Sequence, residues 1–184
     1  KIVFANWKDR VKTETEAVAL ARRADCKGLV LLPPHAFLGE VAAVVQHVEL
    51  CVQDYAPDAF ISGARYALVG HADRRAVGDT DSIVAEKLAL AVTDGLIPVL
   101  CVGESRADRD AGVANGILKH QIKTGLSRLM NPHTLQGVGV NPIVYIAYEP
   151  LWAISTGKNV EHCSVEAAVH RIAYIKEQLL HLGY

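Results

Sequence analysis

Residues 97–104 read Ile-Pro-Val-Leu-Cys-Val-Gly-Glu, an unbroken apolar run that ends in a glycine and a carboxylate. No polar residue alternates with the apolar ones, as it would in a strand with one face in water. Strands that are apolar on both faces are typical of parallel sheets covered by helices. The stretch therefore predicts a buried parallel strand with a polar side chain at its carboxyl end.

Five more short runs share this character, and helical patterns lie between them. The runs are Ile2 to Ala5, Leu29 to Leu32, Val48 to Val52, Tyr66 to Val69 and Ile143 to Ala147. Thr13 and Glu16 have the spacing of a helix-capping box, and Ser164 can cap a helix whose apolar stripe runs from Val165 to Leu179. Repeated strand–helix units predict a parallel α/β fold in one domain over residues 1–184. This pattern fits either a doubly wound sheet or a (β/α)₈ barrel. Its six strands are two fewer than a barrel requires.

Charge and cysteine content exclude several classes of function. The 19 lysines and arginines nearly balance the 20 aspartates and glutamates, so neither nucleic acid nor a membrane surface is the expected partner. A small anionic substrate needs only a local positive site. The four cysteines form neither a CxxC pair nor a disulfide spacing. Together with the lack of a signal or membrane-spanning run, reduced thiols predict a cytoplasmic protein, and Cys101 is expected to pack in the core.

Polar residues follow four of the six predicted strands. These strand ends read Asn6-Trp7-Lys8, Gly70-His71-Ala72-Asp73-Arg74-Arg75, Cys101-Val102-Gly103-Glu104 and Ala147-Tyr148-Glu149-Pro150-Leu151-Trp152-Ala153-Ile154-Ser155-Thr156-Gly157-Lys158. In a parallel barrel the reactive groups lie at the carboxyl ends of the strands. The four segments therefore predict a catalytic site.

The same segments resemble the signatures of the triosephosphate isomerase family, in the family's order and near its spacing. The resemblance implies a TIM (β/α)₈ barrel with about six of its strand–helix units present. It also implies interconversion of dihydroxyacetone phosphate and glyceraldehyde 3-phosphate through an enediolate, a reaction of glycolysis and gluconeogenesis. The expected ligand is a small phosphorylated triose, and no metal or organic cofactor is expected.

The resemblance assigns a role to each matching residue. Glu149 matches the base that takes a proton from carbon. His71 matches the electrophile that polarises the carbonyl, a histidine that stays neutral in this family. Lys8 matches the lysine that holds the substrate anion, and Asn6 contributes a polar donor near the carbonyl oxygen. Taken alone, a strand-end glutamate is more often a salt-bridge partner, and a lone histidine is more often structural.

Pro150 to Lys158 resembles the family's mobile lid. Pro150 and Gly157 are plausible hinge sites, and Trp152 and Ile154 supply apolar surface. Backbone N–H groups at the tip, around Ser155, are expected to reach the substrate phosphate. The alternative reading is an ordinary loop.

Three residues depart from the family pattern. Ala72 and Asp73 stand where serine and glutamate are usual, and Ser155 replaces a glycine common at the lid tip. Ala72 removes a hydroxyl near the resting base, and the shorter Asp73 weakens an expected ion pair with Lys8. If the lid tip needs a positive φ, Ser155 penalises closure. We expect slower catalysis of the same kind.

Larger departures are absences. Twelve residues separate Gln53 from Tyr66, too few for a helix with its loops, and strands 7 and 8 have no counterpart. Either residues of a longer polypeptide are missing from this sequence, or the chain is this short. Two unpaired apolar edges would favour aggregation, so we favour the first explanation. The family's homodimer is expected, but weakened or monomeric if the loop after strand 3 is truly short.

Two alternative functions stay open beside an active isomerase. One is an inactive, truncated barrel fragment or assembly intermediate that binds partners through its exposed edges. The other is a related barrel enzyme that acts on a different sugar phosphate.

Overall fold

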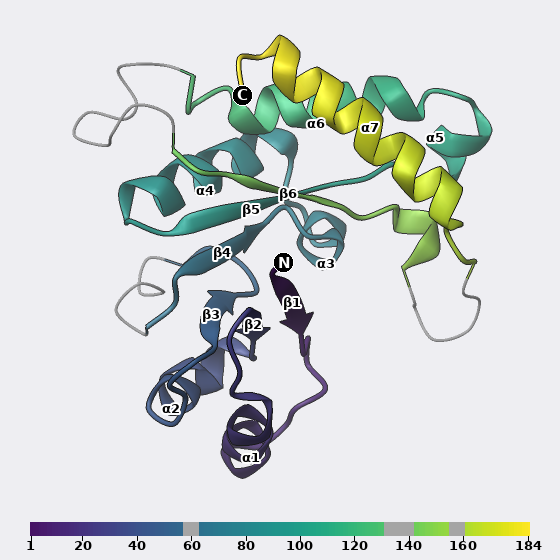
Figure 1. The fold of residues 1–184 in the computed structure, drawn as a ribbon. Helices are drawn as coiled ribbons and strands as arrows, with labels where there is room; N and C mark the ends of the chain where they lie inside the picture. Colours follow the sequence, from purple (N-terminus) through teal and green to yellow (C-terminus); the bar gives the residue numbers. More distant parts are fainter. Residues whose placement is uncertain (57–62, 131–141, 155–160) are drawn as a thin grey trace. The chain divides into compact units, whose positions relative to one another are not determined.

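A computed structural model describes residues 1–56, 63–130, 142–154 and 161–184 (Figure 1). Within these residues there are six strands, one for each predicted apolar run. They are β1 (Val3–Asn6), β2 (Leu29–Leu32), β3 (Glu49–Val52), β4 (Tyr66–Val69), β5 (Ile97–Val102) and β6 (Tyr145–Tyr148). The last strand begins two residues later than predicted, and Ile143 is 66% exposed.

The order of the strands identifies the architecture. The sheet runs β1-β2-β3-β4-β5-β6, and the first four strands pair in parallel, with Val3 beside Leu29 and Cys51 beside Tyr66. A doubly wound sheet reverses its order at a switch point, whereas a barrel adds each strand beside the previous one. The described strands therefore form six units of the (β/α)₈ barrel pattern, as the resemblance implied.

Helices occupy the segments between strands. They are α1 (Glu14–Ala24), η1 (His35–Phe37), α2 (Leu38–Ala42), α3 (Ala72–Ala76), α4 (Asp81–Thr93), α5 (Arg106–Asp110), α6 (Ala114–Leu126), η2 (Leu151–Ala153) and α7 (Val165–His181). Thr13 and Ser164 accept backbone N–H groups at the starts of α1 and α7, which confirms both predicted caps. The carboxylate of Glu16 accepts from the backbone of Lys12 instead of closing the predicted capping box.

The described residues divide into two compact units. The first contains β1 to β4 with α1 and α2; the second contains α3, α5, α6, β6, η2 and α7, while α4 and β5 contribute to both. Leu31, Leu50 and Val52 are buried in the first unit. In the second unit the buried residues include Leu100 on β5 and Leu118, Ile122 and Leu126 on α6. Cys101 is also buried, as predicted. Whether residues 1–184 fold as one domain stays a prediction.

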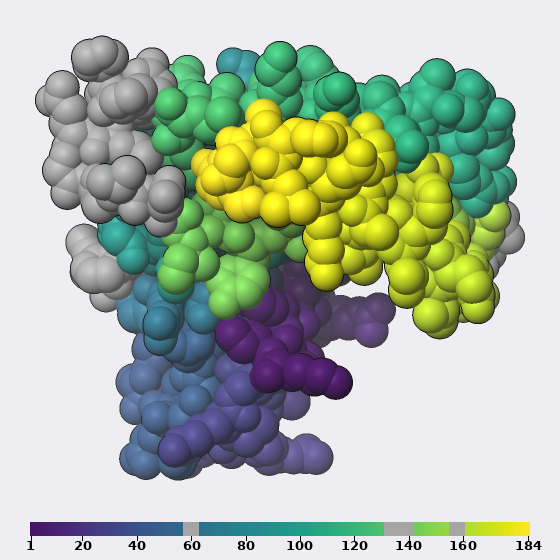
Figure 2. Space-filling model, turned by 45° about the horizontal axis from the view of Figure 1, so that its top comes forward, coloured from purple at the N-terminus to yellow at the C-terminus, as the bar shows by residue number. Residues whose placement is uncertain are grey.

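Helix α7 is buried less than its sequence predicts. Of its apolar stripe only Ile175 is fully buried, whereas Val165 and Ile172 are 75% and 43% exposed. Figure 2 shows α7 in yellow along the surface of the second unit. In the part of the chain that the structure describes, no helix is long and apolar enough to span a bilayer.

Candidate active site

His71 and Glu149 meet at the carboxyl ends of β4 and β6. The His71 Nε2 atom lies 2.9 Å from Oε1 of Glu149, and the backbone N–H of Ala72 donates to Oε2 at 3.1 Å. The side chain of His71 is 7% exposed and that of Glu149 is 22% exposed. Both carboxylate oxygens of Glu149 therefore have a partner, and the Glu149 side chain stays partly accessible to solvent.

The bonds around His71 indicate which ring nitrogen carries the hydrogen. His71 caps α3, and its Nδ1 atom accepts the backbone N–H of Asp73 at 3.1 Å. An atom that accepts a hydrogen bond carries no hydrogen, so the neutral ring bears its hydrogen on Nε2. The Nε2–H group is then the donor to Glu149. The carboxylate of Asp73 lies 3.4 Å from Nδ1.

Close packing against the end of β5 places the main chain of Glu149. Its N–H donates to the carbonyl of Val102 at 2.8 Å, and Gly103 packs directly on its carbonyl group. The side-chain amide of Gln121 on α6 accepts from the N–H of Gly103 and donates to its carbonyl. Because Gln121 is buried and satisfies both groups, Gly103 is held firmly behind Glu149.

A buried carboxylate that sequence reasoning did not assign organises the residues around Glu149. Glu104 is 1% exposed, and its Oε1 atom accepts from the Tyr148 hydroxyl and from Trp152 Nε1, both at 3.0 Å. Its carbonyl also accepts from the N–H of Leu151. Burial raises the pKa of Tyr148 above its ordinary value, and the Glu104 carboxylate adds to the shift. Its position at the end of a buried strand was a signal that Glu104 belongs to the site. Its role could not be assigned from that signal, because Tyr148 and Trp152 are distant from it in the sequence.

Asn6 and Lys8 form a second group, in the first unit. Asn6 Oδ1 accepts the backbone N–H of Lys8 at 2.8 Å, and Gln53 donates to the carbonyls of Lys8 and Leu32. Lys8 has φ of 51°, in the left-handed region that non-glycine residues rarely adopt. The hydrogen bonds of the Asn6 and Gln53 side chains to the backbone of Lys8 hold Lys8 in this conformation. His71 and Glu149 belong to the second unit.

Part of the predicted lid is described. Pro150 precedes the 3₁₀ helix η2, which contains Trp152, and Ile154 ends it. This first part therefore contains one short 3₁₀ helix, and its role as a lid stays a prediction. Ser155, Gly157 and Lys158 lie outside the described residues.

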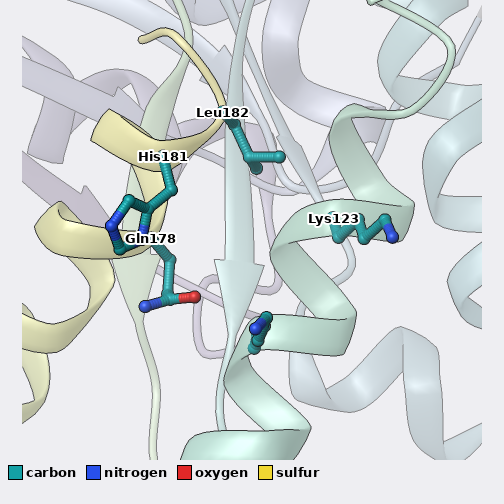
Figure 3. A pocket seen from close by; sticks show the side chains of 5 residues that line it. Lys123, Gln178, His181 and Leu182 are labelled. Carbon is teal, nitrogen blue, oxygen red and sulfur yellow. The ribbon is translucent and has the colours of Figure 1, made fainter.

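A separate small pocket of about 180 Å³ lies between α6 and α7 (Figure 3). It is lined by Lys119, Lys123, Gln178, His181 and Leu182. The ammonium group of Lys123 points away from α7 in Figure 3. The volume is below the roughly 300 Å³ at which ligand pockets begin. We assign it no ligand. Within the described ranges no three His, Cys, Asp or Glu side chains gather as a metal site would require.

Comparison with known proteins gives one consistent result. The family model described as "Triosephosphate isomerase" matches residues 1–181. The triosephosphate isomerase of Dechloromonas aromatica is 32% identical over 100% of this chain and 79% of its own length. That of Symbiobacterium thermophilum is 36% identical over 95% of this chain and 73% of its own length. The first alignment spans 204 positions against 184 residues, so about 20 of its positions have no residue here.

Proposed function

This chain belongs to the triosephosphate isomerase family, and we propose that it interconverts dihydroxyacetone phosphate and D-glyceraldehyde 3-phosphate. The observation that carries the proposal is the pairing of His71 Nε2–H with the Glu149 carboxylate at 2.9 Å. Moving a proton between adjacent carbons requires one base beside carbon and one hydrogen-bond donor beside oxygen. His71 and Glu149 are a donor and a base of these two kinds, side by side.

The proposed first step begins with an exchange of hydrogen bonds. The substrate carbonyl oxygen replaces Glu149 as the acceptor of His71 Nε2–H, which releases Oε1 of Glu149. The freed carboxylate then takes a proton from the neighbouring carbon. As the C–H bond breaks, its electron pair forms the carbon–carbon double bond of an enediolate, and negative charge moves onto the carbonyl oxygen.

His71 stabilises that developing charge through Nε2–H, since a preorganised donor contributes most where charge appears in the transition state. The hydroxyl proton on the neighbouring oxygen moves to the former carbonyl oxygen through His71 Nε2, which gives its hydrogen to one oxygen and takes one from the other. The proton held by Glu149 returns to the carbon that bore the carbonyl, which completes the isomerisation without an oxidant or reductant. The N–H of Ala72 anchors Oε2 of Glu149 in the resting pair. This backbone donor accounts for how the base is held although residue 72 lacks a hydroxyl.

Further parts of the proposal come from family membership. Lys8 supplies positive charge to the substrate phosphate, and Asn6 contributes a donor to the carbonyl oxygen. The lid role of residues 150–158, the cytoplasmic location and the homodimer are proposed on the same ground. No metal or organic cofactor enters, because each step moves only a proton between protein groups and substrate.

A second candidate function is a partner-binding protein without catalysis. The exposed apolar side chains of α7 favour it, since Val165, Val169 and Leu180 are 75%, 60% and 72% exposed. Measured isomerase turnover in the purified chain separates the two candidates.

The test of the base and the electrophile uses Glu149→Asp and His71→Gln. Glu149→Asp withdraws the carboxylate by one methylene, and we expect kcat to fall by roughly 10²-fold, the cost of a ~1 Å misplacement. His71→Gln should lower kcat while the circular dichroism spectrum stays that of the parent.

Two exposed residues of α7 supply matched controls, Glu177→Asp and His170→Gln, and both should retain parental kcat. Unchanged kcat in Glu149→Asp at saturating substrate removes Glu149 from the role of base. A His71→Gln variant that loses only thermal stability makes His71 structural.

A further inference from the structure

Arg109 contacts two residues that follow Glu149 in the chain. Its Cζ atom lies 4.2 Å from the centroid of the Trp152 ring, and Nη1 lies 2.7 Å from Oε1 of Glu161. The arginine side chain is 28% exposed. A guanidinium group over an indole face is attracted by the ring, more strongly when it is partly removed from water.

The helix that carries Arg109 is short but well capped. Ser105 accepts the N–H of Asp108, and the Asp108 carboxylate accepts the N–H and hydroxyl of Ser105, which completes a capping box. These bonds from Ser105 hold the pKa of Asp108 below its ordinary value. A five-residue helix gains little from its own hydrogen bonds, so this cap stabilises the backbone that carries Arg109.

Trp152 is held at two places by one segment of chain. Glu104 accepts the indole Nε1–H at the edge of the ring, while Arg109 covers its face. Glu104 immediately precedes Ser105, the cap residue of α5, and Arg109 lies within α5. The edge and the face of the Trp152 ring are therefore held by two residues of the same short segment. The ring therefore has a defined position relative to the end of β5.

The position of Trp152 bears on Glu149 through a single short turn. Glu149 is followed by Pro150, and Trp152 lies in η2, whose first residue donates to the carbonyl of Glu104. Resting on the proposed function, we propose that Arg109 is a positioning residue, which acts through Trp152 to hold Glu149 in place beside His71.

Arg106 offers a matched control on the same helix. It forms an ion pair with Glu161, as Arg109 does, but the ring contact belongs to Arg109. Removing Arg106 disturbs Glu161 and leaves the contact on Trp152. A role that depends only on charge around Glu161 should respond to either arginine.

The kinetic test compares Arg109→Ala, Arg109→Lys and Arg106→Ala. We expect Arg109→Ala to lower kcat by about 3- to 10-fold, the loss of roughly one cation–π contact, with KM changed less than about twofold. Arg109→Lys should recover part of the loss because an ammonium group also binds the ring. Arg106→Ala should stay within about twofold of the parent. Equal losses in Arg109→Ala and Arg106→Ala would overturn the proposal.

A double-mutant cycle tests whether Trp152 transmits the effect. In a Trp152→Leu background, Arg109→Ala should change kcat by less than about twofold, because the ring it acts on is gone. Independent effects of the two substitutions on kcat would contradict the proposed route.

Fluorescence gives a reading that does not depend on activity. The chain has two tryptophans, so the difference between parent and Trp152→Leu spectra isolates the emission of Trp152. Arg109→Ala should shift that emission to the red and increase its quenching by acrylamide, whereas Arg106→Ala should not. An inactive parent would overturn the proposed function alone, and unchanged Trp152 emission in Arg109→Ala would overturn the role of Arg109. If Arg109→Ala does not fold, Arg109→Gln takes its place in both readings.

Discussion

Substituting Gly103 by alanine should displace the proposed base without touching any titratable group. A Cβ atom at Gly103 would lie 2.6 Å from the carbonyl carbon of Glu149 and closer still to its oxygen. The carbonyl carbon must move from 2.6 Å to at least 3.4 Å to reach ordinary contact, and the closer oxygen must move further, so the shift is about 1 Å or more. Gln121 bonds both backbone groups of Gly103, so the movement falls on Glu149.

This displacement sets the expected size of the effect. A misplacement of ~1 Å in a catalytic group can cost about 10²-fold in rate, so we expect kcat of Gly103→Ala to fall by roughly that factor. Overpacking of this kind also destabilises a fold by about 1–3 kcal/mol, which urea unfolding would measure. The assay is the initial rate of isomerisation at saturating substrate, taken well below the unfolding transition.

Gly116→Ala is the matched control, because a Cβ atom there meets nothing within 4 Å and Gly116 lies inside α6. It should retain parental kcat and gain about 0.5–1 kcal/mol, the usual difference between alanine and glycine in a helix. A folded Gly103→Ala variant with kcat within twofold of the parent would refute the reasoning. The main chain of Glu149 would then tolerate the shift, or Glu149 would not be the base.

Two further predictions concern stability and assembly. Burial alone would raise the pKa of Asp25, but hydrogen bonds from the N–H groups of Val48, His47 and Gln46 outweigh it and hold that pKa well below its ordinary value. Because the folded-state pKa is depressed, the ionised carboxylate stabilises the fold above about pH 4 and stabilises it less as the pH falls below that. Asp25→Asn should therefore unfold at lower urea than the parent at pH 7, and the difference in urea midpoint should shrink between about pH 5 and pH 2. A difference that is constant with pH would contradict this. If the segment from Asp54 to Arg65 is truly this short, the homodimer expected from the family should weaken to a monomer or weak dimer with low activity; if further residues stand there, assembly and specific activity should rise together with protein concentration. Sedimentation and initial rates across a range of concentrations measure both, and a tight dimer of this 184-residue chain at nanomolar concentration would count against both.

Local patterns in the sequence were sufficient for the strands and for the starts of two helices. Apolar runs without alternation predicted each of the six strands in the described residues, because a buried parallel strand needs apolar residues on both faces. Thr13 and Ser164 predicted the first residues of α1 and α7, because a cap satisfies N–H groups only two or three residues away. The order and spacing of motifs led to the family, and that family is confirmed by the comparisons.

The same patterns failed where burial depends on neighbours distant in the chain. The α7 stripe has helical periodicity, yet Val165 and Ile172 remain exposed, since periodicity gives a face and not the element that covers it. The strand–helix pattern also did not distinguish a doubly wound sheet from a barrel, and only the resemblance of the motifs favoured the barrel. Strand order settled it, because order is a relation among all the strands.

Sequence alone therefore determined the strand–helix series and the helix caps, since each depends on residue type at short spacing, and the resemblance to the family supplied His71 and Glu149 as candidate site residues. The tertiary structure alone decided how the site is built: the Ala72 N–H on Glu149 joins residues 77 positions apart, and Glu104 reaches Trp152 across 48. Such bonds leave no periodic trace in the sequence, because they exist only once separate strands end at the same edge of a sheet.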